Sequence, residues 1–83
     1  TLYIIHYTLS IHFPFFMNDE YFLRKAIELA RAGMNSGQGG PFGCIIVKDG
    51  KIVGQGSNRV TSTNDPTAHA EVVAIRDACK NLN

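Results

Sequence analysis

The sequence has little cysteine and little net charge, and each shortage excludes a class of protein. Two cysteines, Cys44 and Cys79, do not make the disulfide framework of a small secreted domain, so a reducing, cytoplasmic location is the simpler expectation. A formal net charge of +1 without a basic stripe gives no electrostatic reason to expect nucleic acid as a partner. Hydrophobic residues make up 45% of the chain, which excludes a disordered polypeptide, and 83 residues allow one small domain at most.

The apolar stretch at residues 1–16 lacks the features of a targeting or membrane segment. It contains no Lys or Arg, so the basic region of a signal peptide is missing. It is too short to span a membrane, and His6, His12 and Pro14 interrupt it. The composition changes at Met17, which we interpret as the true start of the protein, with residues 1–16 as an extension outside the domain. The two histidines have no carboxylate or thiol nearby and predict no metal site.

From residue 17 onward the pattern predicts a helix followed by a β-hairpin. Apolar residues at helical spacing indicate a helix from about residue 19 to about residue 34. Two β-rich segments then flank Asp49-Gly50, the dipeptide that type I′ hairpin turns favour. The first segment, residues 44–48, is mostly apolar, which predicts a strand buried on both faces with Cys44 as a small buried hydrophobe.

A second helix is predicted from about Ala68 to about Leu82. Asp65 or Thr67 is expected to cap its N-terminus, where Pro66 is tolerated. The apolar stripe expected to face the core consists of Val72, Ile75, Cys79 and Leu82. A helix, a hairpin and a helix are therefore the elements on which any site must be built.

The loops around the hairpin hold two candidate binding residues. The glycine-rich loop at residues 37–43 precedes a strand and lacks a Gly-Lys-Ser/Thr ending, which argues against a phosphate cradle. Phe42, in this loop, either packs in the core or presents its ring to a ligand. Asn58 follows a strand end, where its amide either recognises the edge of a heterocycle or closes an Asx-turn.

His69 and Glu71 form the densest group of reactive side chains in the sequence. A His-x-Glu triplet alone carries little information, but this one lies at the predicted start of a helix, where the dipole favours an anion. A neutral imidazole there can bind zinc. A carboxylate near a zinc-bound water can take a proton from it and deliver that proton to a substrate nitrogen.

The residues around this pair resemble a known family. Asp65-Pro66-Thr67-Ala68-His69-Ala70-Glu71 is similar to the first half of the signature of zinc-dependent nucleobase and nucleoside deaminases, in which His-x-Glu precedes a later Pro-Cys-x-x-Cys. The loop at residues 39–43 and Asn58 extend the likeness, which is strongest to bacterial guanine deaminases of the cytidine-deaminase fold. The resemblance covers residues 17–83 and leaves residues 1–16 outside.

The resemblance implies roles for four residues. His69 would be a zinc ligand, and Glu71 would be the proton shuttle rather than a ligand. Asn58 would hydrogen-bond the purine, and Phe42 would shape or line the pocket. The implied reaction is hydrolytic deamination, in which guanine and water give xanthine and ammonia. The family also implies a small-molecule purine partner, no membrane association and a homodimeric complete protein.

The two cysteine ligands of the family are not present in this sequence. Cys79 lies ten residues after His69, roughly 15 Å along a helix, too far for both to touch one ion. Cys44 stays open as a zinc ligand, although the family has no cysteine ligand at this position. We therefore expect an α/β chain that forms the N-terminal half of a three-layer α/β/α deaminase domain, spanning residues 17–83 and inactive alone.

Two alternatives stay open. tRNA-specific adenosine deaminases share the Pro-Thr-Ala-His-Ala-Glu core, although Phe42 and the near-neutral charge favour the guanine enzyme. The chain could also be a non-catalytic remnant. Zinc content and ammonia release distinguish a remnant from an enzyme, and tRNA binding distinguishes the two enzymes.

Overall fold

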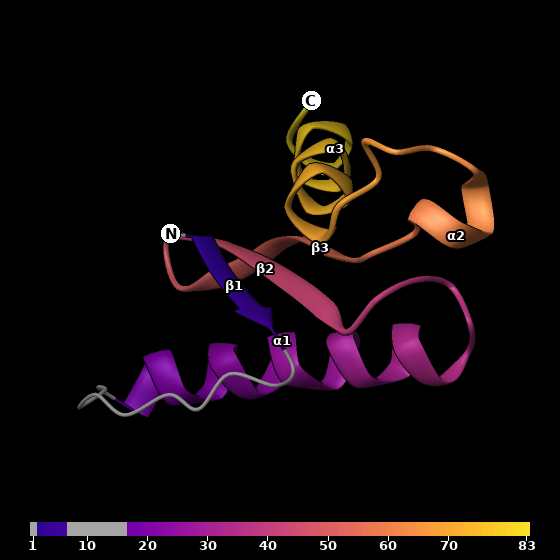
Figure 1. Cartoon of the computed structure of the whole chain (residues 1–83). Coiled ribbons are helices and arrows are strands. Elements are labelled where there is room, and N and C mark those ends of the chain that lie inside the picture. Colours follow the sequence, from indigo (N-terminus) through magenta and orange to yellow (C-terminus); the bar gives the residue numbers. More distant parts are fainter. Residues whose placement is uncertain (1, 7–16) are drawn as a thin grey trace.

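The chain folds into three layers, with a long helix on each face of a small antiparallel sheet (Figure 1). The computed structural model describes residues 2–6 and 17–83. The strands are β1 (Leu2–His6), β2 (Phe42–Lys48) and β3 (Lys51–Ser57), in the sheet order β1-β2-β3. The helices are α1 (Met17–Asn35), the single-turn α2 (Val60–Thr63) and α3 (Ala70–Leu82). This architecture confirms the predicted α/β class and the order helix, hairpin, helix.

The hairpin between β2 and β3 forms as predicted around Asp49 and Gly50. Both residues have positive φ angles, 52° and 77°, as a two-residue type I′ turn requires. A β-bulge between Ile46 and Val47 shifts the register of the pairing near the turn. Because β2 lies between β1 and β3, its backbone pairs with a strand on each edge. This pairing holds Phe42, the first residue of β2, in a defined position.

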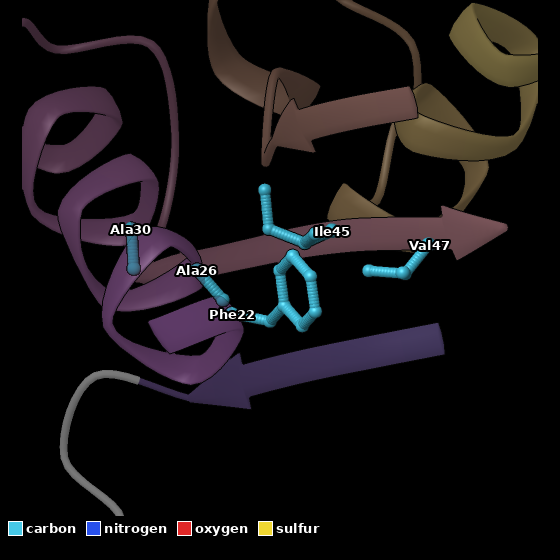
Figure 2. Close-up of a cluster of buried hydrophobic side chains, with 5 residues drawn as sticks. All are labelled: Phe22, Ala26, Ala30, Ile45 and Val47. Carbon is cyan, nitrogen blue, oxygen red and sulfur yellow. The ribbon is translucent and has the colours of Figure 1, made fainter. Parts of the chain in front are cut away.

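The face of the sheet toward α1 carries the larger hydrophobic cluster (Figure 2). Its buried members are Phe22, Ala26, Ala30, Ile45 and Val47. Ile45 is 0% exposed, and burial of such a side chain stabilises the fold by about 1.5–3 kcal/mol. A Cβ at Gly43 would overlap the backbone of α1, so glycine there allows α1 to approach β2 closely.

The face of the sheet toward α3 is packed with small residues. Ala70, Ala74 and Ala78 of α3 are buried, and Cys44 lies with the first two in a second cluster. A Cβ at Gly54 would lie 2.6 Å from the Ala74 carbonyl oxygen. The backbones of α3 and β3 are therefore too close for large side chains between them.

This close packing contradicts the apolar stripe predicted for α3. Ile75 and Leu82 are 47% and 52% exposed, Cys79 is exposed, and Val72 is only half-buried. The prediction was wrong because it assumed that the largest apolar residues mark the buried face. Instead, the glycines of β3 bring its backbone so close to α3 that only alanines fit on the buried face of the helix.

Strand β1 was not anticipated from the sequence. It pairs antiparallel with β2 from Leu2 opposite Ile46 to His6 opposite Phe42. Residue 1 and residues 7–16, which include His12 and Pro14, lie outside the described residues. The domain boundary at residue 17 stays a prediction. Among the helices of the described residues, none has the length and apolar character needed to cross a membrane.

Candidate functional site

One pocket brings together all four residues that the sequence singled out. It has a volume of about 230 Å³ and is lined by Phe42, Asn58, His69, Ala70 and Glu71. These residues come from the start of β2, the residue after β3, and the start of α3. Residues separated by 29 positions in the sequence thus meet where two strands and one helix converge.

His69 and Glu71 lie at the N-terminus of α3. His69 is the N-cap residue, with extended φ and ψ angles of −69° and 156°, and no side chain caps the helix. Its Nδ1 lies 3.8 Å from Glu71 Oε1, and both side chains are accessible, at 56% and 39% exposure. An imidazole and a carboxylate therefore face the same pocket beside the positive end of the helix dipole.

The predicted capping role of Asp65 or Thr67 is wrong. Asp65 instead closes a turn ahead of the helix, where its Oδ1 accepts hydrogen bonds from Thr67 N at 2.9 Å and Thr67 Oγ1 at 2.6 Å. These bonds, followed by the charge of Arg76, lower the pKa of Asp65 below its ordinary value. Arg76 Nη1 lies 3.7 Å from Asp65 Oδ2. Through Asp65, the turn that precedes His69 therefore contacts Arg76 on α3.

Asn58 closes the predicted Asx-turn and also lines the pocket, while its recognition of a heterocycle stays a prediction. Its Oδ1 accepts a hydrogen bond from Val60 N at 3.1 Å, which is an Asx-turn, and its backbone N donates to Phe42 O at 3.2 Å. The residue is only 8% exposed and lines the pocket. Within the described part of the chain its side-chain nitrogen has no hydrogen-bond acceptor, so this donor is the polar atom that the residue offers to a ligand.

Phe42 likewise serves both packing and the pocket. It is half-buried and packs against the cluster of Cys44, Ala70 and Ala74. It also lines the pocket together with the polar residues. An aromatic wall beside an amide donor and a carboxylate suits a planar, polar heterocycle.

Cys44 is a buried free thiol on β2. It is 0% exposed, and burial, with a smaller contribution from the charge of Glu71, raises its pKa to about 12. Metal ligation requires the thiolate, which this environment disfavours. The second cysteine, Cys79, is exposed on α3.

The donors in the described part of the chain do not complete a zinc site. Among residues 2–6 and 17–83, no cluster of three or more His, Cys, Asp or Glu side chains is arranged to hold a metal ion. A catalytic zinc site needs three protein ligands. His69 could serve as one such ligand, because its imidazole is accessible and makes no capping hydrogen bond to α3.

This helix–hairpin–helix fold, with a His-x-Glu pair at the start of α3, defines the class of protein. Residues 17–83 match the family described as the cytidine and deoxycytidylate deaminase zinc-binding region. The chain belongs to this family of zinc-dependent deaminases.

Comparison with individual proteins shows which members of the family this chain resembles. The guanine deaminase of Bacillus subtilis is 64% identical over 66 residues, which are 80% of this chain and 42% of that protein. A tRNA-specific adenosine deaminase of Aquifex aeolicus is 46% identical over 67 residues, or 81% of this chain and 44% of that protein. The chain thus spans less than half the length of the relatives it matches.

Solved structures show the same order of similarity. The crystal structure of the Bacillus subtilis guanine deaminase superposes with a TM-score of 0.76, covering 80% of this chain and 42% of that one. A structure from a study of A-to-I editing by tRNA:A34 deaminases gives 0.71 at 36% identity, covering 76% of this chain and 48% of that one. The fold of residues 17–83 is therefore that of the matched part of a deaminase.

Sequence reasoning missed the support around the pocket. The ion pair between Asp65 and Arg76 lies beside the turn before His69. The sequence predicted a helix cap at Asp65 or Thr67 rather than a turn, and the pairing of Asp65 with Arg76 on α3 depends on the tertiary fold. No local pattern marks such a pair.

Proposed function

We propose that the complete protein is a zinc-dependent deaminase that hydrolyses guanine to xanthine and ammonia, and that this chain supplies its N-terminal part. The observation that carries the proposal is the single pocket formed by Phe42, Asn58, His69 and Glu71. The 64% identity to a guanine deaminase supports guanine as the substrate.

The positions of the side chains in the pocket support the following roles. Glu71 accepts a proton from the attacking water and delivers it to the departing amino nitrogen, so that a C–O bond forms as the C–N bond breaks. Asn58 donates a hydrogen bond to the ring, and Phe42 packs against it. His69 contributes one zinc ligand. The chemistry that zinc supplies when bound is a water acidified to a pKa of about 7.

The other zinc ligands belong to the part of the domain that this chain does not contain. This part of the proposal rests on the chain covering 42% of its guanine deaminase relative and on the incomplete donor set. We further propose a cytoplasmic, homodimeric protein without nucleic-acid or membrane partners, as the near-neutral charge suits a small substrate.

A fusion protein tests the function. Residues 17–83 replace the matching segment of the Bacillus subtilis guanine deaminase, and the fusion is assayed for bound zinc and for ammonia released from guanine. We expect one zinc per chain and catalytic release of ammonia. The 83-residue chain assayed alone is the control and should show neither. An inactive fusion that folds and binds zinc would contradict the proposal, and activity of the chain alone would show that its ligand set has been misjudged.

A second candidate is deamination of adenosine in tRNA. The 46% identity to a tRNA-specific adenosine deaminase favours it. Filter binding with tRNA distinguishes the two, because a tRNA enzyme must contact the phosphate backbone and its affinity must fall steeply with salt. We expect the fusion to retain no tRNA on the filter at any salt concentration.

A further inference from the structure

Gly39 lies directly against Asn58, outside the residues that line the pocket. A Cβ built on Gly39 would lie 2.9 Å from the Asn58 carbonyl carbon and closer still to its carbonyl oxygen and Oδ1. Real Cβ atoms do not approach so closely, so any side chain at position 39 must displace Asn58. The φ angle of Gly39 is not among the positive ones, so glycine is needed here for space and not for backbone conformation.

Asn58, the residue that would be displaced, is held by hydrogen bonds of both its backbone and its side chain. Asn58 donates its backbone N–H to Phe42 O and accepts from Val60 N through Oδ1. It is 92% buried, because only 8% of its surface is exposed. The Asx-turn fixes the orientation of the amide, since exchanging its oxygen and nitrogen would place two donors against each other. The side-chain nitrogen is thereby committed to the pocket as a donor.

We propose that Gly39 is a positioning residue that determines specificity by holding Asn58 as a hydrogen-bond donor to the substrate. The proposal rests on the proposed deaminase function of the pocket. It follows that the substrate edge facing Asn58 presents an acceptor, a ring nitrogen lone pair or a carbonyl oxygen. A substrate with an N–H at that edge would leave two buried donors opposed and would be rejected.

The neighbouring glycine provides a contrast. A Cβ on Gly40 would meet only the ring edge of Phe42, at 3.0 Å and 3.2 Å. A ring can shift by a few tenths of an ångström, whereas the backbone of Asn58 cannot move without breaking the pairing beside it. The demand for glycine is therefore stricter at position 39.

The first test is Gly39→Ala in the fusion protein. We expect kcat/KM for guanine to fall about 10- to 100-fold, mostly through KM, with zinc content unchanged, because one recognition hydrogen bond is misplaced. Gly50→Ala is the matched control. It strains a positive φ of 77° in the distant hairpin turn, where nothing lies within 4 Å, and should leave kcat/KM unchanged. Equal values for the two variants would overturn the proposal.

A double-mutant cycle separates positioning from general destabilisation. If Gly39 acts through Asn58, then Gly39→Ala should change kcat/KM less than about 3-fold in an Asn58→Ala background. Additive losses would show that Gly39 acts by another route. Asn58→Asp keeps the acceptor for Val60 N but removes the donor, so it should lose guanine turnover while keeping the turn. Turnover retained by Asn58→Asp would also overturn the proposal.

Amide hydrogen exchange gives a readout that is independent of activity. The Val60 N–H should be protected in the unsubstituted fusion and exposed in Gly39→Ala, while the Ile46 N–H, which faces β3, stays protected in both. If Gly39→Ala does not fold, Gly39 serves the fold and the proposal fails, because the clash with the Asn58 backbone carbonyl is then not accommodated. An unsubstituted fusion without guanine turnover would refute the proposed function, and the exchange experiment would still test the role of Gly39.

Discussion

At the scale of the residue, the pocket depends on the different environments of two acidic side chains. Glu71 is accessible at the helix N-terminus, 3.8 Å from His69. Asp65 is committed to a turn through two hydrogen bonds to Thr67. One carboxylate is therefore accessible from the pocket, and the other shapes the turn that precedes the helix.

Substitution of Glu71 tests the catalytic assignment. Glu71→Gln in the fusion keeps the size of the side chain but removes its basicity, so kcat should fall by about 10²- to 10⁴-fold while zinc content stays the same. Glu28→Gln on the exposed surface of α1 is the control, since Glu28 only pairs with Lys25. Steady-state ammonia release measures both. A kcat within a few-fold of the unsubstituted fusion would remove Glu71 from the mechanism.

The turn at Asp65 should respond to acid in a definite direction. Its pKa lies below the ordinary 3.8 because the Thr67 hydroxyl and N–H, and then Arg76, stabilise the carboxylate. A depressed native pKa means that the turn is stabilised above the unfolded pKa and loses this stabilisation as pH falls through the native value. NMR titration of the Asp65 carboxyl carbon should give a midpoint below that of an unfolded aspartate. Thr67→Val removes the hydroxyl donor and should raise this midpoint, and an unchanged midpoint would exclude the Thr67 hydroxyl as a cause.

At the scale of the element, α3 shows where sequence patterns succeed and fail. Local signals placed α1, the hairpin and α3 correctly, because periodicity and an Asp-Gly turn are properties of neighbouring residues. The buried face of α3 was predicted wrongly, since Gly54 and Gly56 on another element determine it. The pocket residues were predictable from their motif, but the engagement of Asn58 Oδ1 by Val60 depends on the folded loop.

The packing of α3 gives a matched pair of stability predictions for this chain. Gly56→Ala would place a Cβ 2.7 Å from Ala74 N and should lower the free energy of unfolding by about 1–3 kcal/mol. Ile75→Ala alters a side chain that is 47% exposed and should change the free energy of unfolding by less than about 0.5 kcal/mol. Urea unfolding followed by circular dichroism measures both. The reverse order would mean that the apolar stripe is the packed face after all.

At the scale of the whole molecule, the sheet is narrow and its central strand depends on neighbours at both edges. β2 carries the fully buried Cys44 and Ile45, with α1 and α3 on its two faces. β3 covers one edge through the hairpin, and β1 covers the other. The family match begins at residue 17, so β1 lies outside the part of the chain that the deaminase family shares. An apolar central strand with an open edge is prone to pair with other chains.

Removal of residues 1–16 should therefore increase self-association of this chain. We expect the 17–83 polypeptide to form concentration-dependent dimers or larger species in analytical ultracentrifugation, where the 83-residue chain associates less. Ile5→Pro in the full chain is the matched variant, because it keeps the segment uncharged but removes a backbone donor that faces Gly43 of β2. It should associate as the deletion does. A monomeric 17–83 polypeptide with undiminished resistance to urea would show that β1 does not protect the edge of β2.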